Sequence, residues 1–210
     1  MRTFARKLTK KYNAMKTNMP QRIAALREAM RQQHVDAYII PSSDPHLSEY
    51  PADRWKSRAW ISGFDGSAGT VVVTADKAGL WTDSRYFLQA EAQLEGSGID
   101  LYKMKLPETP SIPDFLLANL HQGQAVGLEG LCYSAEEARD LAAVLAKQGI
   151  RLDSSADLME GIWSDRPAIP SNKIFRMPTE LSGASVSDKL DQLNNQLRQA
   201  GADCLILAAL

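Results

Sequence analysis

The chain has 210 residues, enough for one large domain or two small ones with a substantial core. Apolar residues make up 44% and charged residues 23%, and no apolar run approaches the ~20 residues of a membrane-spanning helix, which excludes a membrane protein and a disordered chain. Six basic residues and no acidic one lie within residues 1–16, so the remainder holds 18 Lys and Arg against 25 Asp and Glu, a balance of −7. This acidic body argues against nucleic acid as the main partner, and nothing in the composition indicates a membrane partner.

Two features bear on the cellular compartment. Residues 1–18 form a basic leader without the apolar core of a secretory signal, and we expect it to be disordered, although its composition also resembles an organelle transit peptide. The two cysteines, Cys132 and Cys204, are 72 residues apart and fit neither a disulfide framework nor a metal-binding pair. We therefore predict a reducing, cytoplasmic compartment, with an organelle left open by the leader.

Helices and strands alternate between residues 19 and 165, which we predict to form the first domain. After Pro20, apolar residues recur at helical spacing, and residues 70–74 are β-branched throughout. The predicted helices cover residues 20–33, 53–61, 83–94, 114–120 and 134–148, and the predicted strands cover 35–40, 70–74, 80–82, 99–104, 125–128 and 150–153. Short apolar strands need cover on each side, so we predict an α/β fold with a mixed β-sheet and helices on both faces.

The end of the chain repeats its beginning. After a linker at 166–186, which contains three prolines, residues 189–207 match residues 22–40 at an offset of 167. The identical pairs are Leu26 and Leu193, Arg31 and Arg198, Gln32 and Gln199, Asp36 and Asp203, and Ile39 and Ile206. Residues 187–210 are thus interpreted as the truncated start of a second copy, with a strand at 204–209, the alternative being a generic helix–strand unit. Because a lone strand cannot cover both its faces, this tail either packs on the first domain or is the cut end of a longer protein.

Arg85 is the strongest candidate for a binding residue. If the helix begins at Asp83, Arg85 lies in its first turn, where the helix dipole opposes a cation by ~0.3–1 kcal/mol. An arginine placed there needs a partner. That partner is either a carboxylate of the protein, Asp83 or Asp65, or an anion or carbonyl group of a substrate.

Other chemical patterns are weak. His46 and Glu49 form an H-x-x-E pair between two prolines that disfavour a helix, which favours a polar loop residue over a zinc ligand. The glycines of segment 63–69 match neither a nucleophile elbow nor a phosphate-binding loop, and are expected to form a tight turn before the strand at 70.

Five strings in one order nevertheless point to a known family. They are IIPS (39–42), HLSEY (46–50), SGFDGSAGT (62–70), WTDSRYFLQA (81–90) and IWSDRP (162–167). Together they resemble the N-terminal region of Xaa-Pro aminopeptidase (aminopeptidase P) in its long, three-domain form. The resemblance covers residues 22–210.

This resemblance implies two successive creatinase/prolidase-type N-terminal domains followed by a catalytic domain. The catalytic domain of the family binds two metal ions, usually manganese, through two aspartates, a histidine and two glutamates, none of which lies in this sequence. By this interpretation the chain itself has no catalytic residue and no metal ligand. The implied partners are short peptides with proline in second position, the chain's own catalytic domain and a second copy in a homodimer.

The resemblance also implies a role for Arg85, as the arginine that reaches toward the active site and contacts bound peptide. This chain has Ser84 where the family often has glycine. Asp83 and His46 are further candidates for the same site. Three alternatives remain open: a free-standing interaction module, the N-terminal part of a prolidase- or creatinase-like enzyme, and an inactive homologue.

Overall fold

The computed structural model describes residues 19–155 and 157–207. The chain divides between Ala168 and Ile169 into two compact units, each described here by itself. The basic leader at 1–18 lies outside the described residues, and so do residues 208–210, which include the last two residues of the strand predicted at 204–209.

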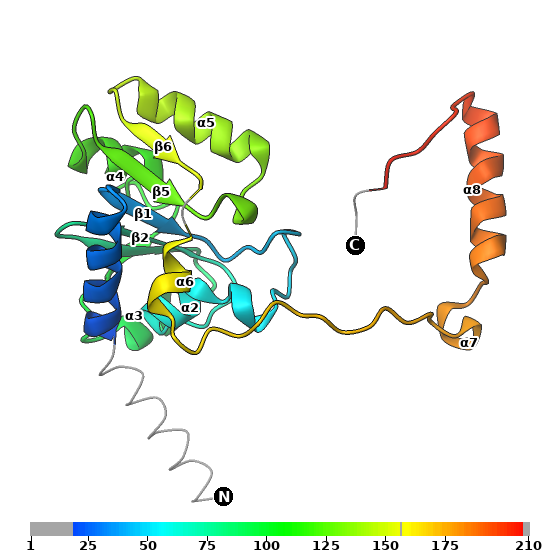
Figure 1. Ribbon diagram of the computed structural model, residues 1–210, viewed down its shortest axis with the longest axis horizontal. Coiled ribbons are helices and arrows are strands. Elements are labelled where there is room, and N and C mark those ends of the chain that lie inside the picture. Colours follow the sequence, from blue (N-terminus) through cyan, green and yellow to red (C-terminus); the bar gives the residue numbers. More distant parts are fainter. Residues whose placement is uncertain (1–18, 156, 208–210) are drawn as a thin grey trace, which may run out of the picture. The chain divides into compact units, whose positions relative to one another are not determined.

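The first unit is built on a six-stranded mixed sheet (Figure 1). Its strands are β1 (Ala37–Ile40), β2 (Thr70–Thr74), β3 (Ala78–Thr82), β4 (Asp100–Lys103), β5 (Ala125–Leu128) and β6 (Arg151–Asp153). They lie in the order β4-β3-β2-β1-β5-β6, and β2 alone runs antiparallel to its neighbours. The predicted mixed sheet is confirmed, and within it β2 and β3 form an antiparallel hairpin.

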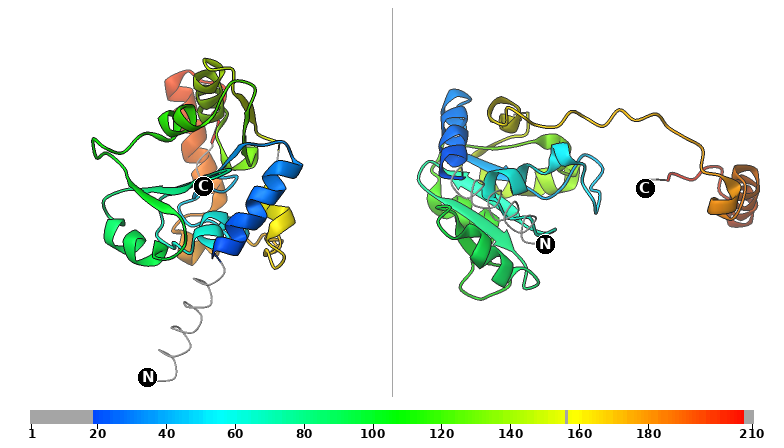
Figure 2. Two further views of the ribbon diagram at one scale, coloured as in Figure 1. Left: turned by 90° about the vertical axis from the view of Figure 1, so that its left-hand side faces the viewer. Right: turned by 90° about the horizontal axis from the view of Figure 1, so that it is seen from below.

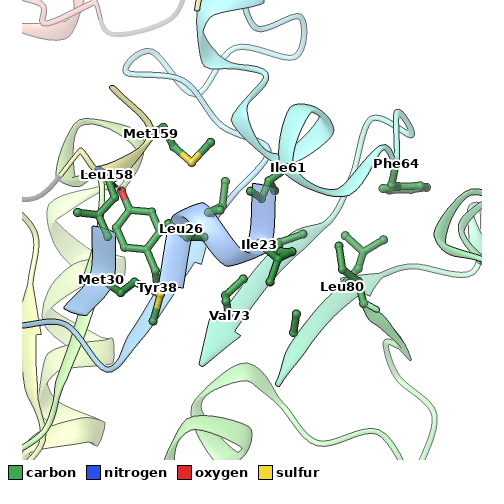
Figure 3. Packing of buried hydrophobic residues seen from close by; sticks show 14 of the residues in the cluster. Ile23, Leu26, Met30, Tyr38, Ile61, Phe64, Val73, Leu80, Leu158 and Met159 are labelled. Atoms are coloured by element: carbon green, nitrogen blue, oxygen red, sulfur yellow. Dashed lines mark hydrogen bonds between the residues drawn. The ribbon is translucent and has the colours of Figure 1, made fainter. Parts of the chain in front are cut away.

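Helices cover both faces of this sheet (Figures 1 and 2). They comprise a helix over 19–32, α2 (Ser57–Ser62), α3 (Phe87–Leu94), α4 (Ile112–Asn119), α5 (Ala135–Ala146) and α6 (Leu158–Ile162). Successive side chains of a strand point to opposite faces, so Tyr38 and Ile40 pack with the helix at 19–32, α2, α3 and α6, as Figure 3 shows in part. Ala37 and Ile39 pack on the other face with α4 and α5. The prediction of helices on both faces is confirmed.

Two helices differ from their predictions, one in its continuity and one in its first residue. The helix predicted over 53–61 is divided into a 3-10 turn, η1 (Asp53–Trp55), and α2. The helix predicted from Asp83 begins at Phe87 instead, because residues 83–86 form a turn in which the Tyr86 N–H donates to the Asp83 carbonyl oxygen (3.0 Å). Arg85 therefore precedes the helix, and the expectation that it lies in the first helical turn, against the helix dipole, is wrong.

The second unit contains α7 (Thr179–Ser182) and α8 (Val186–Ala200). A capping box between Ser185 and Asp188 begins α8, and its apolar side chains Val186 and Leu190 are about half exposed. The strand predicted over 204–209 is not formed at 204–207. A strand requires a hydrogen-bonded neighbour, and the described residues of this unit provide none.

No helix in the described ranges 19–155 and 157–207 is long and apolar enough to cross a bilayer.

The two cysteines differ in solvent exposure, and we therefore expect them to differ in reactivity. Cys132 is 5% exposed, and burial raises the pKa of its thiol to about 12, whereas Cys204 is exposed. Because the thiolate is the nucleophile, we expect one rapid alkylation per native chain at pH 8, at Cys204, and a second only after unfolding. Mass spectrometry of iodoacetamide-treated protein measures this, with Cys204→Ser as the control. Rapid labelling of the native Cys204→Ser variant would contradict the buried position of Cys132.

Candidate functional site

The predicted site residues lie at one edge of the sheet. Strands β1, β3, β4, β5 and β6 run in one direction, so their carboxyl ends meet at the edge where β2 begins. In open α/β sheets, ligands bind in the crevice outside this edge. The loop after β1 carries His46, and the turn after β3 carries Asp83 and Arg85.

Arg85 is held by Asp83. The guanidinium donates from Nε to Oδ1 (2.9 Å) and from Nη2 to Oδ2 (2.8 Å), and Oδ1 also accepts the Arg85 backbone N–H (3.0 Å). These bonds keep the pKa of Asp83 below its ordinary value. The Arg85 side chain is 66% exposed, so this paired fork still faces solvent. The alternative partner, Asp65, instead accepts hydrogen bonds from Gln89 and Gln93, at 2.7 Å each.

Tyr86 links Arg85 to the glycine-rich segment 63–69. The Arg85 guanidinium carbon lies 5.2 Å from the centre of the Tyr86 ring. The Tyr86 hydroxyl is 2.6 Å from Ser67 Oγ, and this hydrogen bond lowers the pKa of Tyr86. The edge of the Tyr86 ring also meets Phe64, with 5.9 Å between ring centres. Arg85 is therefore positioned from both sides, by Asp83 and through Tyr86.

Asp83, Arg85, Tyr86 and Ser67 together form what we call the Arg85 cluster. A pocket of about 290 Å³ opens beside this cluster. The loop after β1, helix α2 and segment 65–67 line it, with Pro41, Ser42, Glu49, Tyr50, Pro51, Trp55, Lys56, Arg58, Ala59, Asp65, Gly66 and Ser67. Ser67 belongs both to the pocket and to the Arg85 cluster. The pocket walls combine proline and aromatic rings with charged side chains of both signs, a surface that suits a peptide better than a single small ion.

Arg58 supports the floor of the site from within the protein. It is buried, donates from Nη1 to the Phe64 carbonyl oxygen (2.7 Å) and from Nη2 to that of Gly66, and lies over the Phe64 ring. Burial lowers its pKa to about 10. Arg58 was not among the predicted site residues. A signal was present, because Arg58 shares the buried face of α2 with Ile61 and Ser62 at i+3 and i+4.

His46 belongs to a turn in the loop after β1, whereas Arg85 is paired with Asp83 after β3. Its backbone N–H donates to Asp44 Oδ1 (2.9 Å), which also accepts from Ser48 (3.0 Å), and its side chain is exposed outside the pocket lining. Within the described part of the chain, no three His, Cys, Asp or Glu side chains are grouped so that they could hold a metal ion. His46 thus belongs to a turn ordered by Asp44 and is separate from the Arg85 cluster.

Comparison with known proteins matches both parts of the chain. Residues 22–162 match the model of the creatinase/prolidase N-terminal domain, and residues 165–210 match a second model with the same description. This chain belongs to the creatinase/prolidase N-terminal domain family. The resemblance predicted from the five motifs is confirmed.

The curated relatives of this chain are considerably longer than the chain itself. The chain is 40% identical over 195 residues to a probable Xaa-Pro aminopeptidase P of Laccaria bicolor, covering 92% of this chain and 30% of the relative. It is 40% identical over 200 residues to aminopeptidase P2 of Arabidopsis thaliana, covering 93% and 28%. The chain therefore spans about 30% of the length of the curated relatives it matches.

A solved structure supports the fold. The X-prolyl aminopeptidase of Caenorhabditis elegans, described as a cytosolic enzyme with a di-nuclear active site, is 30% identical, with a TM-score of 0.75. The match covers 88% of this chain and 32% of that enzyme. The predicted α/β class of the creatinase/prolidase N-terminal type is thus confirmed.

Proposed function

We propose that this chain is the non-catalytic N-terminal part of a metal-dependent Xaa-Pro aminopeptidase, which removes the N-terminal residue from peptides with proline in second position. One observation carries the proposal: more than nine-tenths of the chain aligns at 40% identity with a probable Xaa-Pro aminopeptidase P of a fungus and with aminopeptidase P2 of a plant, over about 30% of their length. We further propose that this enzyme acts in the cytoplasm and that it forms a homodimer.

Such an enzyme answers a specific chemical problem. The bond before proline is a tertiary amide without an N–H, and the ring fixes φ, so peptidases that read this donor cannot bind it in the usual way. Two divalent ions, manganese in this proposal, would polarise the scissile carbonyl and generate the nucleophile. Because the chain spans about 30% of the length of its curated relatives, we propose that the metal ligands lie in the part of the enzyme that this chain does not cover.

The part played by this chain is peptide binding and control of access. Arg85 offers an exposed planar fork that suits a peptide carbonyl or carboxylate, and its ion pair with Asp83 fixes its direction. The neighbouring pocket provides proline and aromatic surfaces next to it. Binding is therefore assigned to Arg85, oriented by Asp83, while His46 is left out because it lies in a separate turn.

The proposal is tested by extending the coding sequence beyond Leu210. We expect manganese-dependent release of the first residue from Xaa-Pro-Xaa tripeptides by the extended protein, and none by residues 1–210. A chelator should abolish the release. Activity of residues 1–210 alone would overturn the proposal. A stop codon after Leu210 would favour the free-standing module, and cleavage restricted to Xaa-Pro dipeptides would favour a prolidase.

Arg85→Ala in the extended enzyme should lower kcat/KM for tripeptides by about ten- to a hundredfold, because a hydrogen bond from a charged donor contributes about 1.5–3 kcal/mol. The fold should remain, since an ion pair this exposed to solvent contributes little to stability. Steady-state kinetics and thermal unfolding measure both effects.

The matched control is Arg151→Ala, which removes another exposed ion pair, to Asp153 (3.0 Å), in β6. Its kinetics should equal those of the unmodified enzyme. Unfolding of the Arg85→Ala variant would instead show that Arg85 is structural.

A further inference from the structure

A buried arginine, Arg166, lies near the end of the first unit and binds several of its segments. The Arg166 side chain is 3% exposed and donates from Nη1 to Asp157 (2.5 Å) and Glu160 (3.1 Å). Its Nη2 reaches Glu129 at 3.4 Å, and its Nε donates to the carbonyl oxygen of Arg54 (3.2 Å). One side chain thus joins the start of α6, the end of β5 and the turn η1.

Arg54 completes this arrangement from the other side. It donates to Glu160 (2.7 Å) and to the carbonyl oxygen of Pro167 (3.1 Å), the residue after Arg166. The guanidinium carbons of Arg54 and Arg166 each lie 5.6 Å from the centre of the Trp55 ring. Trp55 is one wall of the 290 Å³ pocket. The two arginines therefore hold a pocket residue and the backbone at Pro167 in one network, which we call the arginine clasp (Arg54 and Arg166).

A second contact reinforces the same connection. Trp163, three residues before Arg166, stacks on Trp60 of α2 with 5.2 Å between ring centres. Helix α2 also carries Arg58, which holds the carbonyl groups of segment 64–66 below the Arg85 cluster. The end of the first unit is thus joined to the site through α2 as well as through η1.

Stability alone is a poor explanation for this clasp. Withdrawing charged groups from water is unfavourable, and well-packed apolar residues often replace buried ion pairs without loss of stability. What a guanidinium adds is direction, because its planar fork can meet several acceptors at fixed angles at once. The four acceptors of Arg166 come from three separate segments of the chain.

We propose that Arg166 is a positioning residue, which sets the place of Trp55 in the pocket wall and fixes the backbone where the chain leaves the first unit at Pro167. This inference goes beyond the peptidase function and does not depend on it. A displacement of the chain at Pro167 is transmitted through Arg54 to the pocket, since both contacts share the same side chain.

The test uses the 210-residue chain labelled with 5-fluorotryptophan. Its four tryptophans give separate fluorine resonances, assigned by single Trp→Phe variants. Arg166→Lys keeps the charge but cannot reach all the acceptors with one ammonium group. We expect it to shift the Trp55 resonance and to raise amide hydrogen exchange about tenfold at 51–56 and 164–168, through local opening. The Trp81 resonance, from the opposite core cluster, and exchange in β2 and β3 should stay unchanged.

Arg151→Ala is the matched control and should alter neither readout, because its ion pair is exposed and joins two residues of β6. Arg166→Ala should give the same local pattern as Arg166→Lys, with a larger amplitude. An unchanged Trp55 resonance would overturn the proposal. A uniform rise in exchange across the sheet, or failure of both Arg166 variants to fold, would also overturn it, in favour of a general structural role.

Discussion

Replacing Arg58 by methionine is expected to lower the free energy of unfolding of the first unit by about 2–4 kcal/mol, although the two side chains are similar in volume. The Arg58 guanidinium is the donor to two buried carbonyl groups, at Phe64 and Gly66. Methionine leaves both acceptors without a donor, and each unpaired buried group costs about 1–3 kcal/mol. Relief of the desolvated charge, which already lowers the pKa of Arg58 to about 10, offsets part of the loss.

Urea unfolding followed by circular dichroism measures this change. Arg58→Lys should recover only part of the stability, because a single ammonium nitrogen can serve one carbonyl group well and the second only poorly. The control is Arg85→Ala, which removes an exposed arginine of the same site and should leave the free energy of unfolding nearly unchanged. If the Arg58→Met variant unfolded at the same urea concentration as the parent, the two carbonyl bonds would contribute no net stability.

The sheet was predictable because short local sequence patterns indicate its strands. Residues 70–74 and 125–128 are short apolar or β-branched runs bounded by turns, and β2 and β5 occupy those residues. The helix boundary at Ser134 was predictable for a similar reason, since its side chain and that of Glu137 form a capping box. At these two strands and at this helix start, the local signal and the structure agree.

The predicted helix start at Asp83 shows where local reasoning ends. An aspartate before an apolar run is typical of an N-cap, but the Asp83 carboxylate instead accepts the N–H and guanidinium of Arg85. This competing Asx-type turn delays the helix to Phe87. Both structures are compatible with the same short sequence, so the choice between them depends on contacts such as that of Tyr86 with Ser67.

The site was predictable only in part. Arg85 and Asp83 stand two residues apart in a recognisable motif and do form one cluster. The residues that support this site are held by partners distant in sequence. Arg166 donates hydrogen bonds to Arg54, 112 residues away in the chain, and to Glu129, 37 residues away. Single-sequence periodicity carries no information on such pairs, so the arginine clasp was visible only once the fold was known.

Gly66→Ala is expected to destabilise the first unit by about 1–3 kcal/mol through overpacking at the site. A Cβ at this position would stand 2.8 Å from Tyr86 Cδ1 and 2.8 Å from Phe64 Cε2, closer than real Cβ contacts. Neither ring can yield easily, because Phe64 is fully buried and Tyr86 is tied to Ser67. The methyl group therefore has to separate the two rings and move Tyr86, the residue on which Arg85 rests.

The matched control for this substitution is Gly161→Ala in α6, where a Cβ meets no atom within 4 Å. Because alanine is a better helix former than glycine by about 0.8–1.0 kcal/mol, this variant should be as stable as the parent or more so. Thermal unfolding of both variants separates steric crowding from the general effect of adding a methyl group. If Gly66→Ala also unfolded at the parental temperature, the Phe64 and Tyr86 rings would have room to move apart, and the hold on Arg85 would be looser than these contacts indicate.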